Sequence, residues 1–227
     1  MLISVHVPKT AGLSFLEVLK GQFGSGLVID TDFPELTIHY AHLRPVYPRI
    51  SLALPDEREG IRCVHAHAKA TTLRRLFPTA QMAIWFREPL QRCLSHYHHL
   101  RRVSAWVRFT GLRLVPRQVG LRVFMRLPEV RNYYGRVLDG LPLEAFDFVG
   151  ITERFDESVA LYRRLLGGDA DGPPAARRNT NPAQAGKAYE PSDDLRQLFT
   201  ELNQADLALY QAAVQRFEVL RGQHELV

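Results

Sequence analysis

The sequence predicts an α/β fold: a three-layer sandwich with a central parallel sheet and helices at the C-terminal end. Short apolar runs of strand length alternate with segments of helical periodicity along the chain, a pattern typical of parallel sheets. The most apolar run, residues 81–86, is expected to be a central strand buried on both faces. A chain of 227 residues is a natural size for a single domain, so we expect residues 1–227 to form one.

The expected elements follow the chain in order. Strands are predicted at residues 3–7, 27–30, 62–67, 81–86 and 146–151. Helices are predicted from residue 15 onward, at 71–77, from 88 or 89 through 97, at 156–166, at 192–202 and at 204–221. Residues 167–191 are rich in Gly, Pro, Ala and Asn and are expected to form a long loop, a type of segment that often carries function.

A compact loop follows the first strand. Pro8 ends the strand because it lacks a backbone donor, and Ser14 is expected to cap a helix that begins at Phe15. Free N–H groups at a helix N-terminus attract anions, and Lys9 adds a full positive charge beside them. The arrangement is P-loop-like, but in the nucleotide-triphosphatase motif the lysine follows the glycines, whereas here Lys9 precedes Gly12.

A second group of polar residues follows the strand at 81–86. Arg87 comes directly after the strand, and Ser95 lies eight residues later on the predicted helix. Arg92 can share a face of that helix with Ser95. A guanidinium and a hydroxyl that converge on one phosphate form a good anion site. In isolation, however, Arg87 and Glu88 would be read as a solvated charge pair at a helix start.

The third group is His65-Ala66-His67 at the end of a predicted strand. Alternate residues of a strand share a face, so both imidazoles should point the same way. His67 is a candidate general base because histidine titrates near neutral pH. Two alternatives stay open: packed histidines with satisfied hydrogen bonds, and a zinc site completed by His39 and His42.

Two of these stretches resemble the motifs of a known family. Pro-Lys-Thr-Ala-Gly-x-Ser-Phe after an N-terminal strand (residues 8–15) resembles the 5′-phosphosulfate loop of sulfotransferases that use 3′-phosphoadenosine-5′-phosphosulfate (PAPS). Arg-Glu-Pro-x-x-Arg-x-x-Ser-x-Tyr (residues 87–97) resembles the 3′-phosphate motif of the same family. The likeness is greatest to the carbohydrate branch typified by heparan sulfate 2-O-sulfotransferase, in which a His-Gly-His corresponds to residues 65–67.

The resemblance implies a role for each matching position. It assigns the 3′-phosphate to Arg87 and Ser95, and the catalytic roles to His67 as base and to Lys9 as the stabiliser of developing charge, with no metal. The 5′-phosphosulfate would lie on six consecutive residues: Lys9, Thr10, Ala11, Gly12, Leu13 and Ser14. Leu13 stands where the family usually has Thr or Ser, and Asn179 falls where relatives fold a loop over the adenosine.

Other features of the family leave the base and the acceptor open. Other sulfotransferases place a carboxylate base after the first helix, which makes Asp30, Asp32 and Glu35 rivals of His67. The acceptor hydroxyl, on a carbohydrate, a glycolipid or a small molecule, would attack sulfur in line. The variable segments are expected to be a basic helical insert at about 101–140 and a cofactor-covering loop at about 167–191.

Charge is unevenly distributed along the chain. The net charge is +5, yet residues 101–136 contain nine arginines and one acidic residue. Apolar residues are interleaved with these arginines, which predicts one or two basic amphipathic helices. Such a segment suits an anionic glycan, a glycolipid or a membrane surface rather than nucleic acid, although it is also compatible with a helical flap that keeps its arginines in water.

The cysteine content favours a cytoplasmic protein, and the chain resembles soluble, bacterial-type members of the family. Cys63 and Cys93 are too few for a disulfide framework. No signal peptide and no apolar run of about 20 residues is present. The alternatives to a sulfotransferase are a P-loop-type kinase, which needs a magnesium-binding acid, and a non-catalytic polyanion-binding protein.

Overall fold

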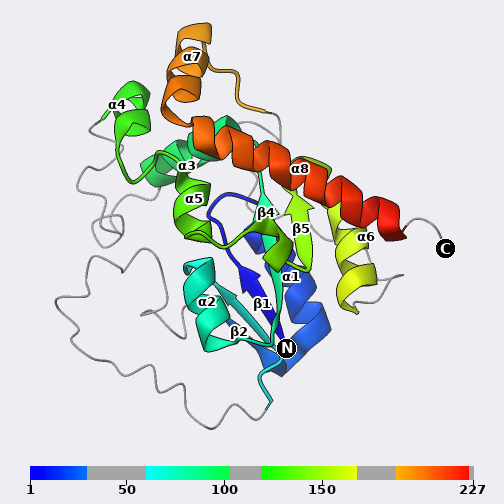
Figure 1. The fold of residues 1–227 in the computed structure, drawn as a ribbon. Coiled ribbons are helices and arrows are strands. Elements are labelled where there is room, and N and C mark those ends of the chain that lie inside the picture. Colours follow the sequence, from blue (N-terminus) through cyan, green and yellow to red (C-terminus); the bar gives the residue numbers. More distant parts are fainter. Residues whose placement is uncertain (30–59, 103–118, 168–187, 225–227) are drawn as a thin grey trace.

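The structure is a computed structural model that describes residues 1–29, 60–102, 119–167 and 188–224. Within these residues, five strands form one parallel sheet in the order β2-β3-β1-β4-β5, with helices on both sides (Figure 1). The strands are β1 Leu2–Val5, β2 Leu27–Ile29, β3 Cys63–Ala66, β4 Gln81–Phe86 and β5 Phe148–Ile151. The predicted α/β class with a central parallel sheet is confirmed.

The helices of the described residues differ from the predicted ones chiefly at their starts. They are α1 Gly12–Phe23, α2 Ala70–Leu76, α3 Pro89–Arg102, α4 Leu121–Arg126, α5 Tyr133–Leu138, α6 Phe155–Leu166, α7 Asp193–Leu202 and α8 Gln204–His224, with short 3-10 turns η1 Gly24–Gly26, η6 Leu143–Ala145 and η7 Thr152–Arg154. The prediction that α1 begins at Phe15 is wrong. Helix α5 lies within the helical insert expected at about 101–140, for which no separate helix bounds were predicted. Helix α3 continues past the predicted end at residue 97.

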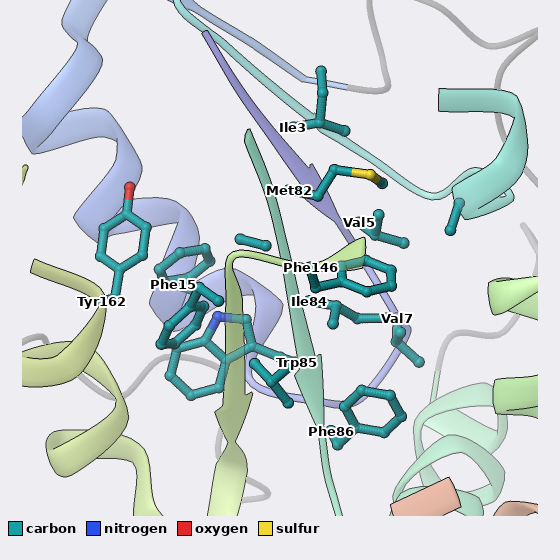
Figure 2. Packing of buried hydrophobic residues seen from close by; sticks show 14 of the residues in the cluster. Ile3, Val5, Val7, Phe15, Met82, Ile84, Trp85, Phe86, Phe146 and Tyr162 are labelled. Carbon is teal, nitrogen blue, oxygen red and sulfur yellow. The ribbon is translucent and has the colours of Figure 1, made fainter. Parts of the chain in front are cut away.

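Side chains of β4 alternate between the two faces of the sheet and divide the core into two layers. Trp85 points toward α1 and α6, where it packs against Phe15 and Phe148 with ring centroids 5.1 and 5.6 Å apart (Figure 2). Phe86 points the opposite way and packs against Tyr134 of α5. Both faces of β4 are therefore buried, as expected for a central parallel strand.

A second, smaller apolar cluster lies beside the sheet layer. It joins α3, α4 and α7, which lie together at one end of the molecule (Figure 1). Phe124 and Met125 of α4 are fully buried in this cluster, while Arg122 and Arg126 of the same helix are exposed. This part of the basic segment is thus an amphipathic helix, as predicted, and it packs on the protein.

Both cysteines are buried and free. Burial raises the pKa of the Cys63 and Cys93 thiols to about 12, so neither is a reactive thiolate near neutral pH. Across the described ranges, none of the helices is both long and apolar enough to cross a membrane.

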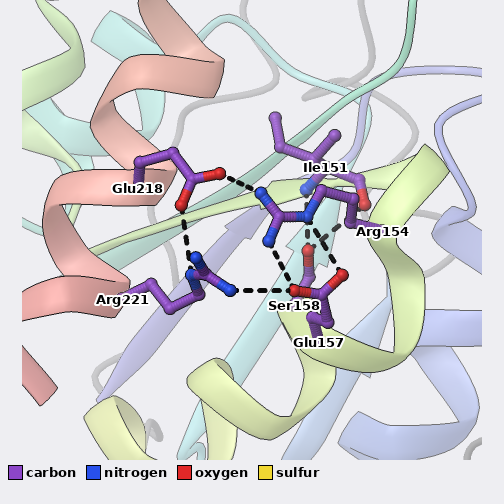
Figure 3. A network of polar contacts seen from close by, with 6 residues as sticks. All are labelled: Ile151, Arg154, Glu157, Ser158, Glu218 and Arg221. Atoms are coloured by element: carbon purple, nitrogen blue, oxygen red, sulfur yellow. Dashed lines mark hydrogen bonds and ion pairs between the residues drawn. The ribbon is translucent and has the colours of Figure 1, made fainter. Parts of the chain in front are cut away.

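The 3-10 turn after β5 is tied to the C-terminal helix by an ion-pair network. Arg154 contacts Glu157 of α6 and Glu218 of α8, and Arg221 contacts the same two carboxylates (Figure 3). Among the described residues, Glu153 takes no part in these ion pairs. Glu153 instead accepts the backbone N–H of Glu88 at 3.0 Å, which ties η7 to the start of α3.

Ser158 provides a stability test within this region. Its buried hydroxyl accepts the N–H of Ile151 at 3.0 Å and donates to the carbonyl of the same residue at 3.2 Å (Figure 3). Ser158→Ala should lower the free energy of unfolding by about 1–3 kcal/mol, because two buried backbone groups lose their partner. Arg221→Gln, which removes two partly exposed ion pairs nearby, should cost about 1 kcal/mol or less. Urea denaturation of both variants checks this, and equal losses would contradict it.

Candidate functional site

The loop between β1 and α1 has an unusual backbone. Lys9 and Ala11 have φ values of 73° and 63°, in the left-handed region that non-glycine residues rarely adopt. Ala11 is the N-cap of α1 and makes no side-chain cap, and the N–H of Phe15 is bonded to the Ala11 carbonyl at 3.0 Å. The N–H groups of residues 12–14 therefore have no acceptor within the helix. Strain in a loop of this kind is typical of ligand-binding sites.

The side chains of this loop serve different purposes from those predicted. Ser14 is not the N-cap; it is buried inside the first turn of α1. Thr10 is fully buried, and its hydroxyl donates to the Val7 carbonyl at 2.8 Å, so it holds the loop closed. Leu13 is 45% exposed. The groups that these positions offer to an anion are mainly backbone amides and the Lys9 ammonium.

Cationic groups from the turn after β4 and from α3 lie close to Lys9. Burial, then Arg102, then Arg87 lower the pKa of Lys9 to about 8. Burial, Lys9 and Arg102 lower the pKa of His99 to about 4. Within the described part of the chain, Lys9, Arg87 and Arg102 form no ion pair with a carboxylate. A concentration of positive charge that is not paired with carboxylates favours the binding of an anion.

Arg87 connects this loop to the second predicted group. Its Nη1 donates a long hydrogen bond of 3.4 Å to the Lys9 carbonyl, so the two motif segments meet. Ser95 lies half-buried on α3 and has no hydrogen-bond partner among the described residues. Ser95, His99 and Arg102 follow each other at a spacing of four and three residues, which places them on one face of α3. Sequence reasoning missed His99, and this spacing could have revealed it.

Arg92 does not belong to this surface. It is fully buried, and its guanidinium lies over the rings of Tyr133 and Tyr134, at 4.4 and 5.5 Å from their centroids. Arg92 therefore belongs to the protein interior behind the site and does not join Ser95 at the surface.

The predicted histidine pair is part of a stack of three rings. The His6 ring lies 4.5 Å from that of His65 and 3.7 Å from that of His67, centroid to centroid. The prediction that both imidazoles share a side of the sheet is confirmed. His65 is buried and hydrogen-bonded to the Ser4 hydroxyl at 2.8 Å, which fits a packed histidine, whereas His67 is half-buried.

His6 was missed by the sequence analysis, although a signal for it existed. The alternation of Ile3, Val5 and Val7 leaves Ser4 and His6 on the opposite face of β1. The register of β1 on β3 places Ser4 beside His65. His6 also explains Gly12, because a Cβ at that position would lie 1.9 Å from its Nε2 atom. The loop glycine therefore lets the histidine stack approach α1.

Several predicted residues lie outside the described ranges. These are the rival bases Asp30, Asp32 and Glu35, the zinc candidates His39 and His42, the adenosine-loop residue Asn179, and residues 103–118 of the basic segment. In the described ranges, no group of three His, Cys, Asp or Glu side chains is placed to hold a metal ion. Of the remaining basic segment, Arg122 pairs with Asp194 of α7 and Arg136 donates to the Pro128 carbonyl at 2.8 Å.

Comparisons with known proteins find a likeness among solved structures. No family model matches the chain, and no curated protein matches it. Among solved structures, the crystal structure of a sulfotransferase from Alicyclobacillus acidocaldarius is similar, with 20% sequence identity over 96% of this chain and 94% of that chain and a TM-score of 0.49. That description belongs to the other protein, and nothing about the donor or acceptor of this chain follows from it.

The charge cluster predicts a pH-dependent instability. Because the pKa of Lys9 is lowered from 10.5 to about 8, folding disfavours its charged form below pH 8, and the penalty fades as the pH rises from 8 to 10.5. Lys9→Met should therefore raise the free energy of unfolding at pH 7 by about 1–2 kcal/mol, allowing for solvent screening. Urea denaturation of parent and variant from pH 7 to 10 should show this gap narrowing above pH 8. A gap that stays constant would contradict it.

Proposed function

We propose that this protein is a sulfotransferase that moves the sulfuryl group from PAPS to a hydroxyl of an acceptor. The observation that carries the proposal is the meeting of two motif segments at one cationic site. The loop at residues 9–14 and the turn at Arg87 are distant in sequence, yet the Arg87 guanidinium bonds to the Lys9 carbonyl. Both segments resemble the sulfotransferase motifs for the two ends of the same donor.

The residues present fit a donor that carries two separated anionic groups. The Lys9 ammonium and the amides at the start of α1 suit the 5′-phosphosulfate, since a strained loop and a helix N-terminus attract anions. Arg87 and Ser95 suit the 3′-phosphate, since a guanidinium and a hydroxyl can bind it together. When bound, PAPS supplies an activated sulfuryl group. Lys9 would stabilise the charge that grows on the phosphate oxygens.

His67 is proposed as the general base. It is half-buried at the carboxyl end of β3, beside the loop that follows β1. Its ring packs against that of His6 with the two planes tilted by 35°, which limits the directions in which it can turn. It would accept the proton of the acceptor hydroxyl as that oxygen attacks sulfur in line. The proposed acceptor is a carbohydrate, a glycolipid or a small molecule, and an anionic one would suit the positive charge of Arg102 and the neighbouring basic segment.

The two other function classes make different binding predictions. A P-loop-type kinase should bind ATP and require magnesium. A non-catalytic polyanion-binding protein should bind heparin and discriminate little between nucleotides. Isothermal titration with adenosine 3′,5′-bisphosphate, ATP and heparin, each with and without magnesium, separates them. A sulfotransferase should prefer the bisphosphate in both conditions.

Arg87 tests the donor site. Arg87→Ala should weaken binding of adenosine 3′,5′-bisphosphate by about 1.5–3 kcal/mol, because a phosphate loses a charged hydrogen-bond partner. Arg75→Ala, which removes an exposed arginine on α2, is the matched control and should bind as the parent does. Isothermal titration measures both. If Arg87→Ala binds as tightly as the parent, the assignment of the 3′-phosphate is wrong.

His67 tests the chemistry separately from binding. His67→Ala should keep the parent's affinity for the bisphosphate but lose about two to four orders of magnitude in turnover. Sulfuryl transfer is measured with an acceptor found by screening hydroxyl compounds. His65→Ala should lose less, because His65 is bonded to Ser4 and acts through packing. A fully active His67→Ala enzyme would point to Asp30, Asp32 or Glu35 as the base.

A further inference from the structure

The backbone of Arg87 is held by a side chain from a different part of the chain. The hydroxyl of Tyr134, on α5, accepts the N–H of Arg87 at 2.9 Å and donates to the carbonyl of the same residue at 2.5 Å. One hydroxyl thus satisfies both backbone polar groups of the residue that follows β4. The Cα of Arg87 lies between its N–H and its carbonyl. The two hydrogen bonds therefore also fix the position from which the Arg87 side chain extends.

Neighbouring side chains hold the rest of this turn in the same way. Thr152 donates to the Phe86 carbonyl at 2.9 Å, and Glu153 accepts the N–H of Glu88 at 3.0 Å. Glu88 in turn accepts the N–H groups of Leu90 and Gln91 at the start of α3. The turn from β4 to α3 is therefore fixed by side chains rather than by sheet bonding, and Tyr134 holds its central residue.

Tyr134 is itself fixed by a buried carboxylate. Asp206 of α8 is fully buried and accepts the N–H groups of Tyr133 and Tyr134 at 2.7 and 2.9 Å. The N–H of Gly135 lies 3.4 Å from the same carboxylate. Asp206 therefore caps the start of α5. The ring of Tyr134 also packs on Phe86 at 4.8 Å, so both ends of the side chain are held.

Arg92 also packs against Tyr134. Its guanidinium lies over the rings of Tyr133 and Tyr134, and its Nε and Nη1 atoms are buried without hydrogen-bond partners among the described residues. A buried charge held mainly by two ring faces restricts how those rings can shift. Arg92 therefore restrains Tyr134, which in turn holds the backbone of Arg87.

We propose that Tyr134 is a positioning residue for Arg87 and thereby sets the preference of the site for ligands that carry a 3′-phosphate. The inference rests on the proposed function, because Arg87 is the residue assigned to that phosphate. A charged hydrogen bond is effective only if its donor is held at the right place before the ligand arrives. The Tyr134 hydroxyl supplies that restraint from outside the ligand site.

The test compares two ligands that differ by the 3′-phosphate alone. The affinities of adenosine 3′,5′-bisphosphate and adenosine 5′-monophosphate are measured by isothermal titration, and their ratio isolates the 3′-phosphate contact. In Tyr134→Phe the ring still packs on Phe86, but the hydroxyl is gone. The ratio should fall about tenfold, while affinity for the monophosphate stays within about twofold of the parent.

Tyr133→Phe is the matched control. Tyr133 neighbours Tyr134 and also stacks on Arg92, but its buried hydroxyl has no hydrogen-bond partner in the described part of the chain. Removing it should leave the ratio unchanged. This control separates loss of the Arg87 restraint from any general effect of removing a buried tyrosine hydroxyl near Arg92.

Each other outcome has a distinct meaning. An unchanged ratio in Tyr134→Phe, or an equal loss of affinity for both ligands, would overturn the positioning role. A parent protein that binds both ligands equally would instead overturn the 3′-phosphate assignment in the proposed function. If Tyr134→Phe does not fold, Asp206→Asn replaces it, because one amide oxygen cannot hold all the N–H groups that the carboxylate holds. An unchanged ratio in that variant would then count against the proposal.

Discussion

The parallel pairing of β1 with β4 is the interaction on which the site depends. These strands lie side by side at the centre of the sheet, with Leu2 opposite Gln81 and Val5 opposite Ile84. Because parallel strands end at the same edge, the loop after β1 and the turn after β4 must be neighbours. Lys9 and Arg87 meet for this reason. Any ligand that bridges these two segments is thus recognised by a geometry that the core imposes.

The sequence predicted the layers of the fold well because each depends on a local pattern. Residues 81–86 form β4 with the predicted bounds, and the two C-terminal helices begin and end close to the expected residues. Hydrophobic periodicity determines these elements, and burial in the sheet reinforces it. The start of α1 was misjudged for a physical reason. A serine near a helix start is normally the cap, yet here a left-handed Ala11 begins the helix and Ser14 is buried.

The parts that could not be predicted depend on contacts between distant segments. Asp206 caps α5 from α8, and no local pattern near residue 133 announces that partner. Arg154 likewise pairs with Glu218 rather than with its sequence neighbour, because α8 crosses the turn after β5 (Figure 3). The candidate site shows the same division. Lys9, Arg87 and His67 were found from motifs, and periodicity carried a signal for His6 and His99 that was missed. The contact of Tyr134 with Arg87 became visible only when strands and helices were placed together.

The folded protein carries two unfavourable features at the loop after β1, and they have a common explanation. Left-handed backbone at Lys9 and Ala11 costs about 1–2 kcal/mol for each residue. The partly buried positive charges of Lys9 and Arg87 and the exposed charge of Arg102 repel one another. Neither feature contributes to the stability of the fold, and the sheet and its helices must offset both.

A bound anion would offset the repulsion among the positive charges, because each of them would be attracted to it. The same attraction would raise the pKa of Lys9. The polar contacts behind the site, from Asp206 through Tyr134 to Arg87, keep the turn after β4 from relaxing away from Lys9 while no anion is bound. Under the proposed function, this restraint would hold the positive charges together in the free protein, so that the site would bind an anion without first having to assemble.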